Sequence, residues 1–195
     1  MPQRTTITIF ALLASLATLF FLAIQSPGDR YTMAGPNSNP ANEDVQLSLK
    51  LATAPNNKLR ITITNHDSTT ARTFLRWDTP FDPRAIDMEI LTLKDAESGS
   101  EVPSPGLKVS RKLPPPHEDL IEVPAGGEVS EEIELKAPWL PSDGRKMQVA
   151  AAEGEWKAVW KKGKDEVKDE ELADFGGEDV VRGAFRSEGT GEVTV

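Results

Sequence analysis

Residues 45–65, VQLSLKLATAPNNKLRITITN, set the fold class of this chain. Apolar and polar residues alternate in 45–51 and again in 59–65, which is the period of a strand with one buried face. The sequence Pro-Asn-Asn at 55–57 lies between the two runs and favours a turn. The stretch therefore predicts a β-hairpin.

The same pattern continues through the rest of the chain, with short apolar runs separated by Pro, Gly and Asn. It predicts further strands, with an edge strand at 106–112; the ranges are 73–77, 88–95, 106–112, 120–124, 128–138, 146–152, 155–161, 183–189 and 191–195. Residues 165–176 instead predict one short inserted helix, with Leu172 and Phe175 three positions apart and Gly176-Gly177 ending it. We therefore expect an all-β domain over residues 44–195, an antiparallel immunoglobulin-like β-sandwich.

The alternation also predicts which side chains form the core of this domain. The inward phase of the predicted strands should be mostly buried, and it comprises Leu47, Leu49, Ile61, Ile63, Trp77, Leu91, Ile133, Leu135, Val149, Trp156 and Trp160. Trp156 and Trp160 are four residues apart in a predicted strand, which places both on one face. They would either cap the core beneath the helix or form a platform for a glycan or peptide.

The N-terminal residues 1–25 predict a secretory signal. Arg4 supplies the positive start, and residues 9–24 form an apolar run that only Ser15 and Thr18 interrupt. The cleavage site is poor, so an uncleaved signal anchor stays open, with membrane contact only through residues 7–24. Both interpretations place residues 44–195 outside the cytoplasm. Residues 26–43 are rich in Pro, Gly and Asn and predict a flexible linker.

Composition narrows the classes of function. The net charge of −9 disfavours nucleic-acid binding, because phosphates attract an excess of Lys and Arg. The chain has no cysteine, so it has neither a disulfide framework nor a thiolate nucleophile. His66 and His117 lack the spacing of a zinc site. We therefore expect no metal, no cofactor and no catalytic residues, and we predict that the chain is not an enzyme.

Residues 75–85, LRWDTPFDPRA, are the first candidate recognition loop. Pro80 and Pro83 each remove a backbone donor and favour a wide turn after the strand. In one interpretation Trp77 enters the core and the loop is structural. In the other, Phe81 and Arg84 are exposed and bind a partner.

Residues 110–120, SRKLPPPHEDL, are the second candidate. Their three prolines favour a polyproline II segment, which is either a stiff crossover or a ligand for an aromatic groove. We name Pro115 and His117 there as possible recognition residues, together with Trp139, which lies between two prolines and should be partly exposed.

Three stretches carry a resemblance to known proteins. LRWDTPFDPRA (75–85), VSRKLPPPHEDLIEVPAGGEVSEEIEL (109–135) and VAAAEGEWKAVW (149–160) resemble a group of small fungal secreted proteins of unknown function with an immunoglobulin-like β-sandwich. More distantly, their arrangement is similar to the prosegment of deuterolysin-type fungal zinc metalloproteases. The catalytic H-E-x-x-H half of such a protease is missing here, so the resemblance implies only a prosegment-like role.

These observations lead to two hypotheses about function. The first is a secreted or membrane-tethered, non-catalytic binding module whose partner is an extracellular protein or glycan. The second is a stand-alone prosegment-like inhibitor or folding helper of a secreted protease.

Overall fold

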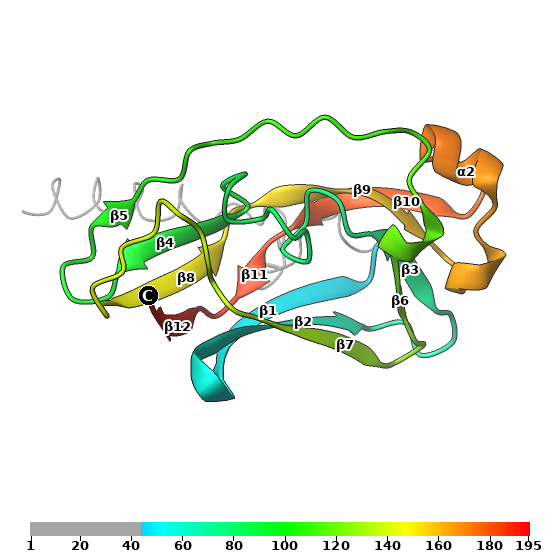
Figure 1. The fold of residues 1–195 in the computed structure, drawn as a ribbon. Coiled ribbons are helices and arrows are strands. Elements are labelled where there is room, and N and C mark those ends of the chain that lie inside the picture. Colours follow the sequence, from blue (N-terminus) through cyan, green and yellow to red (C-terminus); the bar gives the residue numbers. More distant parts are fainter. Residues whose placement is uncertain (1–43) are drawn as a thin grey trace, which may run out of the picture. The chain divides into compact units, whose positions relative to one another are not determined.

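A computed structural model describes residues 44–195; the predicted signal (1–25) and linker (26–43) lie outside the described residues. The described part is mostly β-structure, with three four-stranded sheets and one short helix (Figure 1). The strands are β1 (Leu47–Ala54), β2 (Lys58–Asn65), β3 (Arg72–Leu75), β4 (Leu91–Asp95), β5 (Glu101–Val102), β6 (Leu120–Val123), β7 (Glu128–Ile133), β8 (Lys146–Ala151), β9 (Gly154–Trp160), β10 (Val180–Phe185), β11 (Ser187–Glu188) and β12 (Gly191–Thr194). Within this part, no helix is both long and apolar enough to span a membrane.

Sheet A has the strand order β11-β1-β2-β7 and contains the predicted hairpin. β1 and β2 pair antiparallel from Leu47 opposite Asn65 to Ala54 opposite Lys58, and the turn is a 3-10 helix, η1 (Pro55–Asn57). The structure differs in two details from the predicted antiparallel immunoglobulin-like sandwich. The strands form three sheets, and β11 pairs with β1 in parallel.

Sheet B (β10-β9-β3-β6) and sheet C (β12-β8-β4-β5) lie end to end and share strand connections. β8 leads directly into β9, while β3 and β4 lie end to end opposite them, with Phe74 facing Val159 and Leu91 facing Ala151. β5 and β6 pair with β4 and β3 in the same way. Two long connections therefore join strands that lie end to end. Residues 76–90, the first excursion, connect β3 to β4, and residues 103–119, the second excursion, connect β5 to β6.

The main core lies between sheet A and the layer formed by sheets B and C, and all three sheets contribute to it (Figure 1). An aromatic row runs through it, since the ring of Phe74 meets Phe81 at 5.8 Å and Trp156 at 5.0 Å, and Trp156 meets Phe185 at 5.0 Å. The predicted core residues are buried, except that Ile133 is only partly buried. Ile133 ends β7, the edge strand of sheet A, so one of its sides is open.

The expectation that Trp156 and Trp160 share one face is wrong. β9 contains an irregularity against β10, because Val181 faces Val159 while Gly183 faces Trp156, so β9 has one residue more than its partner. The extra residue reverses the alternation. Trp156 consequently enters the main core, and Trp160 packs in a second cluster with Leu172.

The predicted helix is present but shorter than expected. A 3-10 turn, η3 (Lys164–Glu166), precedes α2 (Asp169–Asp174), whose buried Leu172 covers the outer face of sheet B. Phe175 ends the helix in a left-handed conformation with φ of 54°. Trp160 donates its indole N–H to the carbonyl of Gly176 at 2.9 Å, which holds the end of the helix on the sheet.

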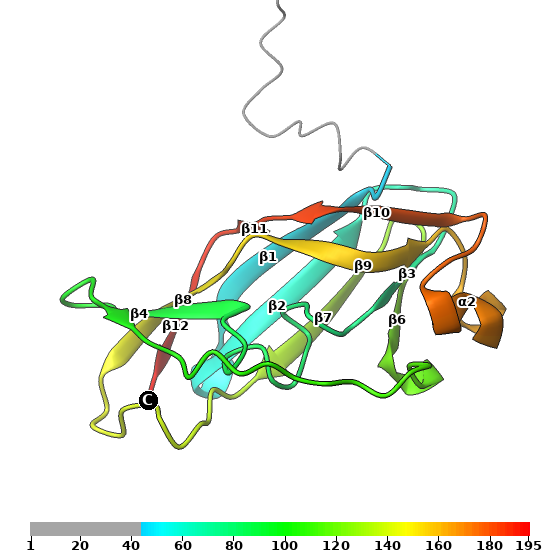
Figure 2. The ribbon, with the colours of Figure 1, turned by 90° about the horizontal axis from the view of Figure 1, so that it is seen from above.

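The edge strand predicted at 106–112 does not form. Residues 103–112 contain no strand, turn or bend, and therefore run extended without a pairing partner in the described part of the chain. Prolines at 103, 105 and 114–116 flank the stretch and cannot donate to a ladder. Figure 2 shows the segment passing from the β4–β5 hairpin to β6 beside the rest of the domain.

Candidate binding surface

The excursion at 76–90 is a compact series of turns rather than an open loop. Asp82 shapes it, because its carboxylate accepts the backbone N–H of Asp78 at 3.0 Å and that of Arg84 at 2.9 Å. Such carboxylate-to-backbone bonds stabilise turns. Trp77 and Phe81 are buried, with 4% and 2% of their surface exposed. These bonds and buried side chains hold the first excursion in place as a support for the second excursion.

The second excursion packs directly against the first through Arg111. The guanidinium of Arg111 lies 5.2 Å from the ring centroid of Trp77 and forms an ion pair with Asp82, whose side chain is fully buried. Trp77 in turn donates its indole N–H to the carboxylate of Asp119 at 2.6 Å. Because a buried carboxylate needs a partner of opposite charge, Arg111 links the two excursions tightly.

Asp87 anchors the start of the second excursion. Its carbonyl accepts the backbone N–H of Leu107 at 2.7 Å and the hydroxyl of Ser104 at 3.1 Å. Its carboxylate accepts the indole N–H of Trp139 at 2.8 Å. At the other end of the stretch Pro115 is buried. Residues 105–113, which we call the exposed segment, are thus held at both ends and at Arg111.

Between these anchors the exposed segment presents apolar side chains to solvent. Leu107 (41%), Val109 (36%) and Leu113 (52%) are the large apolar side chains that stand exposed in residues 44–195. The hydrogen bonds found among the described residues include none to the backbone N–H or carbonyl groups of 108–113. An extended backbone with free hydrogen-bonding groups and exposed apolar side chains is a template for pairing with another strand.

The exposed segment is also basic within an acidic chain. It carries Lys108, Arg111 and Lys112 and no acidic residue, whereas the whole chain has a net charge of −9. Lys108 and Lys112 are exposed, and Arg111 is half-buried because it is bound to Asp82. The segment therefore favours a partner surface that is both apolar and acidic.

A cleft of about 380 Å³ lies between the first excursion and the end of β7 with residues 134–136 that follow it. Arg76 crosses this cleft and binds Glu131 at 2.9 Å. Arg84, with more than half of its side chain exposed, stands at its rim beside Asp87. The cleft places the free edge of sheet A close to the paired excursions.

The structure separates the predicted recognition residues into two groups. Trp77, Phe81 and Pro115 are buried, which agrees with the interpretation in which Trp77 enters the core and not with the one in which Phe81 is exposed. Arg84 is exposed, and Trp139 is partly exposed as expected. The sixth residue, His117, lies apart from both groups, with its imidazole 3.0 Å from the Asp169 carboxylate.

Sequence reasoning missed the residues that are exposed. Leu107 and Val109 lie in the run GLKVSRK, which predicts a short edge strand at 106–112, and Leu113 follows it directly. The signal that distinguishes the two cases is the set of flanking prolines, which lack a backbone N–H and keep the stretch out of the sheets of its own chain.

The carboxyl groups with a clearly shifted pKa lie outside this surface. The pKa values of Asp67 and Asp95 are lowered by hydrogen bonds from the residue two or three positions later in each turn. The hydrogen-bonded Arg145 lowers the pKa of Asp143 to about 2, and the ammonium of Lys162 lowers that of Glu171. Among residues 44–195, no three His, Cys, Asp or Glu side chains are grouped so that they could share a metal ion.

Comparison with known proteins shows the family of the described domain. The profile of a family described as an immunoglobulin-like domain matches residues 44–194. An uncharacterized secreted protein of Arthroderma benhamiae is 32% identical over 133 residues, which cover 67% of this chain. The match spans 65% of the length of that relative. No solved structure is significantly similar.

Proposed function

This chain belongs to the family of immunoglobulin-like domains, and on that premise we propose that it is a non-catalytic binding module that acts outside the cytoplasm. Its relative from Arthroderma benhamiae is named a secreted protein, which agrees with the secretory signal or anchor predicted at residues 1–25. One fold carries many functions, so the support for the binding role comes from the surface itself.

The exposed segment, residues 105–113, carries this proposal. Contiguous apolar side chains on the surface of a soluble domain mark interaction sites, and Leu107, Val109 and Leu113 share this one stretch. The segment is also pre-organised, because Leu107 is bound to Asp87 and Arg111 to Asp82. A partner therefore does not have to order the segment on binding, which lowers the entropic cost of association.

The chemistry of the segment favours a protein over a glycan as the partner. Glycan platforms are built from exposed aromatic rings, whereas Trp77, Trp156 and Trp160 are buried and Trp139 is only partly exposed. The exposed apolar side chains are aliphatic, and the neighbouring backbone is free to pair with a strand. Addition of a strand to an unpaired backbone is a common mode of protein recognition.

An affinity capture tests the binding role. The full chain, tagged at its C-terminus, is incubated with culture medium and cell-surface extract of its source organism. The variant L107S/V109S/L113S is compared with a control variant, K50S/E188S, at two exposed positions of sheet A. We expect a protein that is captured by the wild type and the control and lost with the triple variant.

Because all the altered side chains are exposed, both variants should retain the melting temperature of the wild type within about 2 °C. Capture of the same proteins by all three chains, or of none, would contradict a binding role for the exposed segment.

The prosegment-like role is a second candidate that the same segment supports. An extended stretch of chain with free backbone groups is also what the substrate cleft of a protease accepts by strand addition. The full chain should then slow a deuterolysin-type protease or raise the yield of its refolding, and L107S/V109S/L113S should do neither. Equal rates and yields with and without the chain would remove this candidate.

A further inference from the structure

The edge strand β7 of the same chain has an unpaired backbone edge and a charge opposite to that of the exposed segment. β7 is the last strand of sheet A and pairs only with β2 among the described strands. Residues 128–134 read EVSEEIE, so four of seven positions are glutamates. Glu128, Ser130 and Glu132 are exposed and alternate along the strand. The outer backbone edge of β7 is therefore unpaired and strongly acidic.

The two unpaired stretches match residue by residue. The exposed segment contains KVSRK at 108–112, and β7 contains EVSEE at 128–132. When Ser110 is placed opposite Ser130, both lysines of the segment, Lys108 and Lys112, face the glutamates at 128 and 132. This holds for parallel and for antiparallel pairing, because the two motifs have the same spacing. Opposite charges directly across a pair of strands stabilise it.

The segment and β7 lie along the same edge of the sandwich, the segment beside the layer of sheets B and C and β7 in sheet A (Figures 1 and 2). β6 and β5 form the edge of the layer made by sheets B and C, and the exposed segment connects them. β7 forms the edge of sheet A next to β6, and the cleft beside β7 is lined by the excursion that supports the segment. A two-fold axis on this side can thus bring the segment of each copy to the β7 edge of the other.

We propose that the chain forms a symmetric dimer in which the exposed segment of one copy adds as a strand to the β7 edge of its partner. The inference rests on the proposed function, because it names the partner of the same segment as a second copy of this chain. Two segments repel each other, and so do two β7 edges, so the charges allow only the reciprocal pairing. The two-fold arrangement closes at the dimer rather than growing into a filament.

Some of the groups on β7 already have partners within the chain. Arg60 binds Glu132, and Arg76 binds Glu131, in both cases from the same copy. These pairs leave the outer backbone edge free, and Glu128 has no ion-pair partner among the described residues. The dimer contact therefore adds to these pairs rather than replacing them.

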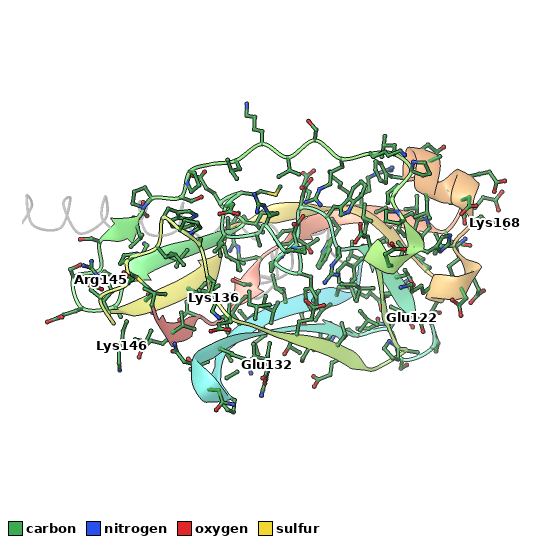
Figure 3. The ribbon with its side chains drawn as sticks, viewed as in Figure 1. Glu122, Glu132, Lys136, Arg145, Lys146 and Lys168 are labelled. Carbon is green, nitrogen blue, oxygen red and sulfur yellow. The ribbon has the colours of Figure 1, made fainter. Side chains whose placement is uncertain are left out.

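Charge reversal tests this contact. The chain is expressed with its own N-terminal residues in a fungal host, purified in the form the host produces, and followed by sedimentation velocity over a range of concentrations. K108E/K112E and E128K/E132K are compared with the quadruple variant that combines them. K146E/K168E is the control for K108E/K112E, because it makes the same change of charge at lysines that lie on other elements (Figure 3).

We expect a concentration-dependent dimer for the wild type and the control. Each paired reversal should raise the dimer dissociation constant about 10- to 100-fold, since four cross-strand pairs become repulsive. The quadruple variant should regain the affinity of the wild type, and added salt should weaken the dimer.

A wild type that stays monomeric at every concentration, or a dimer that neither reversal affects, would overturn the inference. The proposed function has a separate readout, the loss of capture in L107S/V109S/L113S. A monomeric chain that still captures a protein through those side chains would remove the dimer and leave the binding module in place.

Discussion

Replacement of Phe81 by alanine distinguishes a structural from a recognition role of the first excursion. Phe81 is 2% exposed, and its ring meets that of Phe74 edge to face at 5.8 Å and 79°. Truncation of a buried Phe to Ala costs about 3–5 kcal/mol, of which the aromatic pair supplies about 0.5–1.5 kcal/mol. Against a domain stability of about 5–15 kcal/mol, F81A should fold but be much less stable.

The assay is urea unfolding of the full chain, followed by tryptophan fluorescence, since three of the four tryptophans are buried. The control is R84A in the same excursion, because the Arg84 side chain is 56% exposed and its pair with Asp87 lies at the surface. R84A should change stability by at most about 0.5 kcal/mol. A loss below about 1 kcal/mol for F81A would refute the buried position of Phe81 and restore it as a recognition residue.

Three further predictions concern the stability of the fold. R111M leaves the buried Asp82 carboxylate without its ion-pair partner and should cost about 3–5 kcal/mol in urea unfolding. L172A removes the side chain that joins the helix to sheet B and should lower stability by about 2–5 kcal/mol, measured in the same way. Because Lys162 lowers the pKa of Glu171, this pair stabilises the fold above pH about 4.5 and is lost as the pH falls through the lower, folded-state pKa. The melting temperatures of wild type and E171Q should therefore differ at pH 7 and converge towards pH 3.

Local sequence patterns are enough to predict the fold class. The alternation in 45–51 and 59–65 predicts β1 and β2 together with their turn, and the spacing of Leu172 and Phe175 before Gly176-Gly177 predicts the inserted helix. These features depend on neighbours within a few residues, which is why a sequence pattern reveals them.

The remaining differences arise from contacts between distant residues. That β3 and β4 lie end to end opposite β9 and β8 depends on pairing across some 50–90 positions, which no local pattern reports. The bulge that turns Trp160 away from Trp156 depends in the same way on the partner strand β10.

The sequence predicts the candidate binding surface only in part, for the same reason. The sequence indicates residues 75–85 and 110–120 separately, and their contact through Arg111 and Asp82 exists only in the folded structure. An alternating run such as 106–112 has the same appearance whether its apolar side chains are buried or exposed. Its position between the prolines decides which of the two occurs.

Photocrosslinking from the exposed segment tests most directly whether this segment is the binding surface. The photoreactive residue p-benzoylphenylalanine replaces Val109 in the full chain, and the control chain carries it in place of Lys50 on sheet A. After irradiation of the producing culture, we predict a covalent adduct from position 109 and none from position 50. Its mass distinguishes a second copy of the chain from a different protein. A chain that yields no adduct at position 109, or equal adducts at both positions, would contradict the assignment.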